Sequence, residues 1–246
     1  MTINAKGNRK QDRIYSAPLF EIEFMKINEF PQPKKVSGVI YINERPLFPI
    51  SWLYKQEFCE YQIYLENVAG IKVEPTRQMV VGKQEHENLY EEFKKEAVPA
   101  TLDEMLLESK KAQIFSRELS VRDLGHGIYG LIDEVLLTPD SFIVVDDKPG
   151  TKTFLSNINQ VFGYCLAFKS SVVLQDSRPV IATLRERGTD NIYWSVPFDP
   201  QAEGHITTVV ERIHSLLDGA LDFNSSDNPN RCRACRFRER CDRFCS

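Results

Sequence analysis

A short apolar run in the middle of the chain ends in charged residues whose spacing could support chemistry. The stretch IVVDDKPG ends in Asp146, Asp147 and Lys148. Side chains alternate between the two faces of a strand, so Asp146 and Lys148 share one face while Asp147 lies on the other. A strand that enters solvent explains this pattern, and so does a site in which opposite charges are used together.

Acidic residues on the two preceding segments could join Asp146 around one cation. Glu118 and Asp133 lie on the segments that we predict as the two strands before this one. Neighbouring strands lie about 4.8 Å apart, so their carboxylates can converge on one ion. Crowded carboxylates raise each other's pKa values unless a cation is bound. Oxygen ligands suit Mg²⁺ or Mn²⁺, which can activate a water, while Lys148 stabilises a phosphorane-like transition state. Hydrolysis of a phosphodiester fits this set.

A second group of reactive side chains lies near the C-terminal end. Cys232, Cys235 and Cys241 are separated by two and then five residues. A reducing compartment argues against a disulfide framework and favours metal ligation. The fourth ligand could be Cys245, giving a four-cysteine zinc knuckle, or Cys59, if the two ends of the chain meet.

The composition is that of a soluble globular protein. The chain has 246 residues, of which 42% are hydrophobic and 27% are charged, with a net charge of −4. It contains neither an apolar run of the roughly 20 residues that span a bilayer nor a secretory signal, so we expect a cytoplasmic protein without a membrane partner. Residues 231–246 carry six arginines against Glu239 and Asp242. Such a basic end could bind phosphates or could simply be solvated.

Hydrophobic periodicity predicts an α/β core with a mixed sheet flanked by helices. The first 35 or so residues are polar and are expected to form a weakly structured arm, and Ser51 could cap the first helix. Thr101 and Glu104 form a capping-box pattern. Cys165 lies in the apolar stripe of a helix, where we expect it only to pack. The predicted helices span 49–66, 77–96, 101–111, 155–169 and 201–220, and the predicted strands span 115–124, 127–138, 141–148, 178–187 and 191–198.

Several motifs in this order resemble those of RecB-like nucleases in the PD-(D/E)XK superfamily. They are GKQEH at residues 82–86, GLIDEV at 130–135, Asp-Asp-Lys at 146–148, and the pair Gln160 and Tyr164. The resemblance implies a restriction-endonuclease-like core with metal-binding and catalytic residues at these positions. His86, Asp133 and Asp146 would bind the metal with the backbone carbonyl of Asp147, Lys148 would be catalytic, and Gln160 and Tyr164 would position the nucleic acid or the reacting phosphate.

The division of the cysteines resembles the CRISPR-associated Cas-four family of these nucleases. That family holds a four-iron, four-sulfur cluster with one cysteine of an N-terminal helix and three of a C-terminal run, here Cys59 with Cys232, Cys235 and Cys241. The resemblance implies an N-terminal extension at 1–45 and a nuclease domain at 46–246 with an N-terminal helical region, which the cluster closes. Tyr164 and basic residues of the tail would then contact the strand.

The resemblance also implies a function. The protein would be a Mg²⁺- or Mn²⁺-dependent nuclease that acts on single-stranded DNA or overhangs, with a role in CRISPR spacer acquisition and the CRISPR integrase as a possible partner. A stand-alone DNA repair nuclease could use the same residues. A metal-stapled DNA-binding module without catalysis, or a zinc-stabilised protein-interaction subunit, would share the cysteines but would not cleave DNA.

Overall fold

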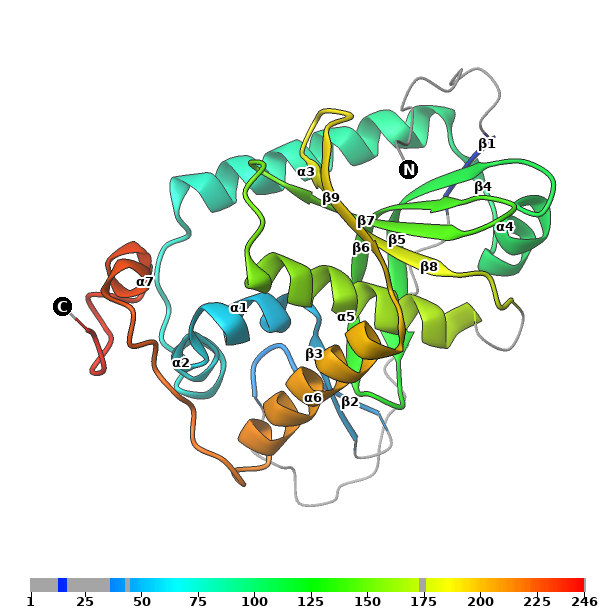
Figure 1. Cartoon of the computed structure of the whole chain (residues 1–246). Helices are drawn as coiled ribbons and strands as arrows, with labels where there is room; N and C mark the ends of the chain where they lie inside the picture. Colours follow the sequence, from blue (N-terminus) through cyan, green and yellow to red (C-terminus); the bar gives the residue numbers. More distant parts are fainter. Residues whose placement is uncertain (1–12, 17–35, 43–44, 173–175, 246) are drawn as a thin grey trace.

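The protein is built around one large mixed β-sheet (Figure 1). The computed structural model describes residues 13–16, 36–42, 45–172 and 176–245. Antiparallel strands β5, β6 and β7 form its centre, and β8 joins β7 in parallel. The order across the sheet is β4-β1-β5-β6-β7-β8-β9, with β3 pairing β6 and β2 pairing β3. The strands span Arg13–Ser16 (β1), Ile40–Ile42 (β2), Arg45–Pro49 (β3), Val98–Pro99 (β4), Ile114–Asp123 (β5), Ile128–Leu137 (β6), Phe142–Lys148 (β7), Val180–Glu186 (β8) and Ile192–Pro197 (β9).

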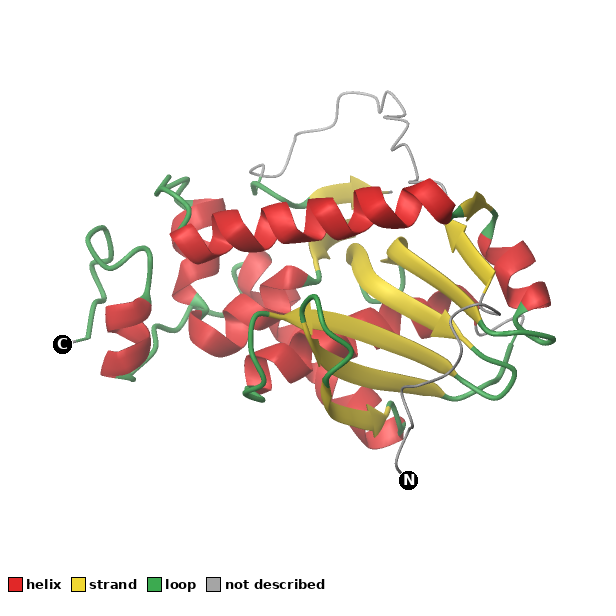
Figure 2. Cartoon of the chain, turned by 90° about the horizontal axis from the view of Figure 1, so that it is seen from above, coloured by secondary structure: helices red, strands yellow, loops and turns green. Residues whose placement is uncertain are grey.

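Helices lie on both sides of this sheet (Figure 2). The longest, α3, crosses one face and buries only Phe93, which packs edge-on against Phe115 of β5. On the other face, Phe142 of β7 meets Phe168 of α5, a helix whose apolar side chains are largely buried. The helices span Ser51–Cys59 (α1), Tyr61–Ile63 (α2), a π-helical turn at Tyr64–Val68, Arg77–Glu96 (α3), Leu102–Glu108 (α4), Leu155–Val172 (α5), Pro200–Leu217 (α6) and Pro229–Ala234 (α7).

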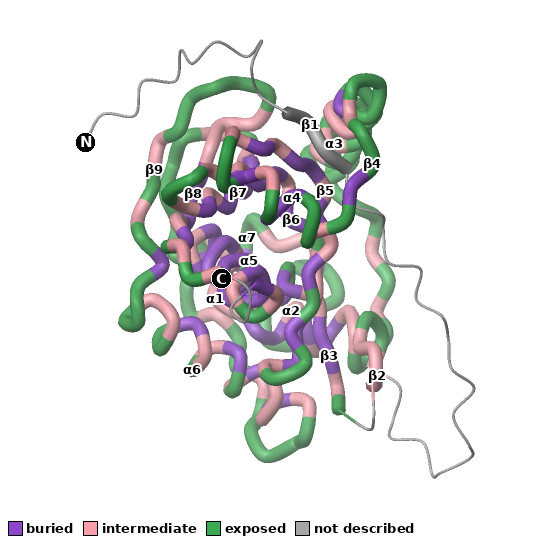
Figure 3. Tube along the Cα trace, turned by 90° about the vertical axis from the view of Figure 1, so that its right-hand side faces the viewer, coloured by how far each residue is buried: buried purple, intermediate pink, exposed green. Residues whose placement is uncertain are grey.

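The main core lies where α1, α5 and α6 meet the sheet. Buried positions concentrate on the central strands and on these helices (Figure 3). Gly163 of α5 permits a close approach of α1, since a β-carbon there would overlap with Leu53. A second, smaller cluster of buried residues anchors the C-terminal tail, because Phe237 is fully buried against Tyr61 and Leu65. The tail therefore packs on the α1–α2 region near the start of the folded chain.

The fold class predicted from the sequence is confirmed, with corrections at the start of the chain. Within the arm expected over the first 35 or so residues, Arg13–Ser16 pairs with two strands of the sheet. Ile40–Ile42, in the extension expected at 1–45, forms a hairpin with β3. The Thr101–Glu104 capping box is present. The predicted Ser51 cap is wrong, because Ile50 is the N-cap and makes no side-chain bond to the helix.

Candidate active site

Two central strands separate where the candidate site lies. The β6–β7 ladder ends at the pair Glu134–Val145, one position before Asp133 would face Asp146. The carboxylate of Asp133 instead accepts a hydrogen bond from the backbone N–H of Asp147 at 2.7 Å. Strand β7 stays paired with β8 as far as Lys148, so β6 is the strand that diverges. Asp133 and Asp146 are consequently neighbours within one opening of the sheet.

A chain of polar contacts leads from Asp146 to helix α5. Lys148 Nζ lies 2.8 Å from Asp146 Oδ2 and donates to Gln160 Oε1, also at 2.8 Å. Gln160 Nε2 in turn donates to the hydroxyl of Tyr164 at 3.3 Å. The expected alternation holds, because Asp146 and Lys148 lie on the face that α5 covers. Tyr164 is only 6% exposed, so its ring offers no open face to a base. Its role in positioning the nucleic acid or the reacting phosphate stays a prediction.

The opposite helix brings an imidazole to the same place. His86 of α3 has its Nδ1 3.8 Å from Glu118 Oε1 and 3.7 Å from Asp133 Oδ1. Ligand atoms of His86, Glu118 and Asp133 all lie within 4.8 Å of one another. Glu118 has a φ of +51°, the left-handed region that non-glycine residues rarely adopt. Backbone strain of this kind is found where function requires a side chain in one position, which favours Glu118 as a ligand.

The electrostatics of the cluster are those of buried carboxylates crowded together. Burial and the neighbouring Asp146 raise the pKa of Asp133 to about 7. Burial also raises the pKa of Asp146, although Lys148 opposes this shift. The nearby carboxylate of Glu118 raises the pKa of His86. Each shift favours a bound proton at a position where a divalent cation would otherwise supply the positive charge.

The side chain of Asp147 is held away from this cluster. On the α3 face, Asp147 and Glu134 form a buried ion-pair network with Arg117 and Arg185, in which Arg185 contacts both carboxylates at 2.7–3.0 Å. Burial raises the pKa of Asp147, but the bonds from Arg185 outweigh this effect and lower it. Each cluster aspartate is therefore followed directly by an acidic residue that is anchored on the opposite face.

The backbone carbonyl of Asp147 already has a protein partner. Arg187 donates to it at 3.1 Å and pairs with Glu85 of α3 at 3.3 Å. The Arg187 side chain is 12% exposed. This arginine follows β8 directly and belongs to no motif that sequence reasoning recognised. A metal ligand role for the Asp147 carbonyl stays a prediction.

Residues 72–242 match the family described as the PD-(D/E)XK nuclease superfamily, which spans more than half of the chain. The chain belongs to the PD-(D/E)XK nuclease superfamily. No curated protein shows a significant match. Two solved structures are similar, both with a TM-score of 0.44. SSO0001 is 14% identical over 84% of this chain and 91% of its own. A protein from Eubacterium rectale described as a candidate exonuclease is 12% identical over 76% of this chain and 87% of its own.

The cluster contains donor atoms of the kinds that divalent metal ions accept. Nucleases of this superfamily use divalent metal ions, and the donors here belong to His86, Glu118 and Asp133.

Among the residues that the structure describes, no helix is long and apolar enough to cross a membrane.

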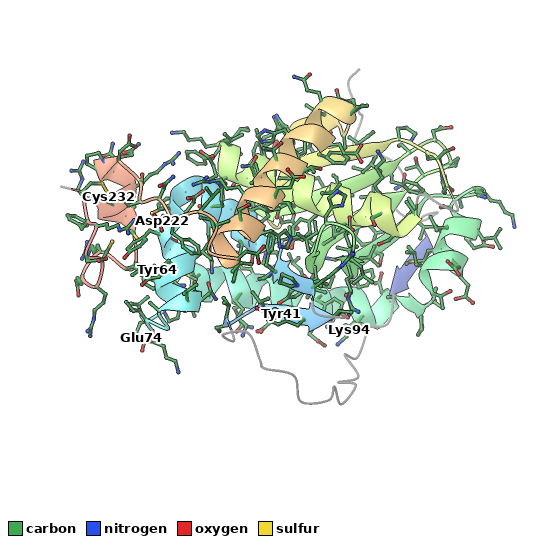
Figure 4. All side chains as sticks on the ribbon, turned by 90° about the horizontal axis from the view of Figure 1, so that it is seen from below. Tyr41, Tyr64, Glu74, Lys94, Asp222 and Cys232 are labelled. Atoms are coloured by element: carbon green, nitrogen blue, oxygen red, sulfur yellow. A yellow bond between two sulfur atoms is a disulfide. The ribbon has the colours of Figure 1, made fainter. Side chains whose placement is uncertain are left out.

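The cysteines of this superfamily member meet at a separate place, at the C-terminal end of α1. Cys59, Cys232, Cys235 and Cys241 line one pocket, and Gln62 donates to Cys235 Sγ at 3.3 Å. Cys232, labelled in Figure 4, is bonded to Cys245 in a disulfide. Cys165 is buried in α5, away from this pocket. Cys59 and the C-terminal run are thus close, and their role as cluster ligands stays a prediction. The disulfide between Cys232 and Cys245 was not expected.

Proposed function

We propose that the protein is a divalent-metal-dependent DNA nuclease that hydrolyses phosphodiester bonds in single strands or overhangs. The observation that carries the proposal is the meeting of His86, Glu118 and Asp133. Asp146 lies close enough to Asp133 to raise its pKa, and it contacts Lys148. Carboxylates and an imidazole crowded at the divergence of two strands are costly to keep charged without a cation. A site of this kind is selected for what it binds.

His86, Glu118, Asp133 and Asp146 would hold the ion. When bound, Mg²⁺ or Mn²⁺ supplies an activated water and stabilises charge on the phosphate. An imidazole ligand suits transition metals better than it suits Mg²⁺, so we expect Mn²⁺ to support higher activity. The positive φ of Glu118 aims one carboxylate at the set, and the N–H of Asp147 fixes the orientation of Asp133.

Lys148 would stabilise the negative charge that develops on the reacting phosphate. Its ammonium group already lies at the cluster, held by Asp146 and Gln160. A pre-positioned cation gains more in this partly buried place than it would in water, because the surroundings need not reorganise during the reaction. Gln160 orients the lysine, and Tyr164 orients the glutamine, so both act through Lys148.

A structural four-iron, four-sulfur cluster held by Cys59, Cys232, Cys235 and Cys241 is part of the proposal. Four cysteines around one pocket supply the thiolates that such a cluster needs, provided that the Cys232–Cys245 bond is reduced. A cluster there would join α1 to the tail and close the domain at 46–246. A four-cysteine zinc site with Cys245 in place of Cys59 is the alternative.

Anaerobic purification separates these alternatives. An iron–sulfur protein is brown and a zinc protein is colourless. Cys59→Ser abolishes the colour if the proposal is correct, whereas Cys245→Ser leaves it intact. The reverse result assigns the fourth position to Cys245, and a colourless wild type that contains zinc rejects the cluster.

Cleavage of end-labelled single-stranded and double-stranded DNA, with Mn²⁺ or with EDTA, tests the activity. We expect Mn²⁺-dependent cleavage of the single strand that Asp146→Ala abolishes. Binding without cleavage under every metal tested would instead identify a DNA-binding module.

The resemblance of this protein to the Cas-four family supports a role in trimming DNA before CRISPR integration, with the integrase as partner. A role in DNA repair is the second candidate. Copurification of the integrase with the tagged protein distinguishes the two.

A further inference from the structure

Helix α1 presents two aromatic side chains in line beside the candidate site. Tyr54 and Phe58 are four residues apart, one helical turn, and their rings stack with centroids 6.4 Å apart and planes 13° apart. The side chain of Tyr54 is exposed at 37%, and Phe58 is half-buried. Apolar rings of this size are normally covered by the core, so a stacked pair that remains accessible has surface available for a ligand.

The first ring lies next to the proposed catalytic lysine. Lys148 Nζ lies 5.8 Å from the centroid of the Tyr54 ring. This contact depends on the close packing of α1 on α5 at Gly163, which holds α1 beside the end of β7. A nucleotide adjacent to a phosphate at Lys148 would therefore meet Tyr54 first.

The second ring leads to the basic tail. The guanidinium of Arg231 lies over Phe58, 6.0 Å from the ring centroid, and donates to the carbonyls of Glu57 and Phe58 at the end of α1. Beyond it, further arginines of the tail, Arg233, Arg238, Arg240 and Arg243, are exposed. Cations at the C-terminal end of a helix are favourable, so this arrangement fixes the tail on α1, while Arg233, Arg238 and Arg240 keep exposed side chains.

We propose that Tyr54 and Phe58 form a base-stacking track that carries a single DNA strand from Lys148 to the arginines of residues 231–243. This inference rests on the proposed nuclease function and adds the path of its substrate. Charge complementarity and continuity with the candidate site both identify the occupant as a polyanion with flat apolar groups. A single strand has both, since each base has an open face.

The same features disfavour a duplex as the occupant. Bases within a duplex are stacked on one another, so they cannot stack on Tyr54 or Phe58 without being unpaired. Arginines alone would bind either form through phosphates. The aromatic pair is what selects unpaired bases, and it takes over the contact that the buried Tyr164 cannot make.

Fluorescence anisotropy with two labelled strands tests the track. One is a twelve-nucleotide oligothymidylate, and the other is an abasic strand of the same length, both measured in EDTA so that no cleavage occurs. We expect Tyr54→Ala to weaken binding of the oligothymidylate about fivefold to a hundredfold, the range that stacking of one base contributes. Binding of the abasic strand should stay unchanged, and Tyr54→Trp should bind like the wild type.

Two further variants serve as controls for this binding experiment. Tyr90→Ala is the matched control, because Tyr90 stacks on Phe93 and lies under Lys94 in a similar arrangement elsewhere, on α3. Phe58→Leu keeps the lining of the cysteine pocket apolar and should weaken only the base-bearing strand. Tyr54 does not line that pocket, so its result stands if Phe58 variants misfold.

The outcomes distinguish this inference from the proposed function. Equal affinity of the wild type and Tyr54→Ala for the oligothymidylate overturns the track, even if the wild type cleaves DNA. A selective loss of binding to the base-bearing strand in a protein that never cleaves supports the track and contradicts the nuclease. A wild type that binds neither strand overturns the track.

Discussion

The carboxylate of Asp133 makes two different contacts with its two oxygens. Oδ2 accepts the backbone N–H of Asp147 at 2.7 Å, and Oδ1 faces His86 Nδ1 at 3.7 Å. The first contact replaces the ladder bonds that end one position earlier, and the second joins β6 to α3. One side chain thus holds the strands apart and presents a metal ligand in the opening that results.

Metal binding is expected to strengthen as the pH rises through about 7. Burial and Asp146 raise the pKa of Asp133 to about 7, so protons compete with the metal below that value. A raised pKa also means that stability contributed by this proton in the metal-free protein is lost as the pH rises through about 7. Mn²⁺ should therefore raise the melting temperature more at pH 8 than at pH 6. Asp133→Asn, which keeps an oxygen for the Asp147 N–H, should reduce that difference.

Loss of the lysine should lower the rate far more than loss of its partner. We expect Lys148→Ala to reduce kcat about 10²- to 10³-fold, as for removal of other groups that stabilise transition-state charge. Gln160→Ala removes one orienting hydrogen bond, so a loss of about tenfold is expected. Single-turnover cleavage of a labelled strand measures both. Equal losses would show that the glutamine itself contacts the substrate.

A glycine at position 118 should relieve backbone strain that Glu118 causes in the folded protein. Its φ of +51° costs a non-glycine residue about 1 kcal/mol. Glu118→Gly and Glu118→Ala both remove the carboxylate, so both should weaken Mn²⁺ binding. Only glycine relieves the backbone, and urea unfolding should find it about 1 kcal/mol more stable than alanine. Equal stabilities of the two variants would contradict strain at this position.

Loss of Arg185 should destabilise the folded protein, because this arginine belongs to the buried ion-pair network with Glu134 and Asp147. Arg185→Met leaves Glu134 and Asp147 with only Arg117 between them, and breaking a buried ion pair typically costs about 3–5 kcal/mol. Urea unfolding of the metal-free protein should detect this loss. Arg240→Met, at an exposed position, should change stability by less than about 0.5 kcal/mol.

The sequence allowed the central elements to be predicted because their patterns are local. The helix at 77–96 has the predicted bounds, and the strands that carry Asp133 and Asp146 lie within about one residue of their predicted ends. Alternation along β7 also gave the correct face for Lys148. Strands β1, β2, β3 and β4 escaped prediction because each is at most five residues long.

Other features of the site depend on contacts that no local pattern encodes. Glu118 belongs to none of the motifs, and its left-handed backbone is invisible in the sequence. Arg187 and Tyr54 lie outside every motif, and only the packing of α3 and α1 brings them to the site. The burial of Tyr164 likewise results from packing of α5 against the sheet.

The contact between Arg231 and the end of α1 spans 174 positions of sequence. A chain emerging from the ribosome can form the central hairpins and α5 well before that arginine is synthesised, so the last stage of folding must await it. Until then, the stacked rings of α1 and the thiol of Cys59 are uncovered.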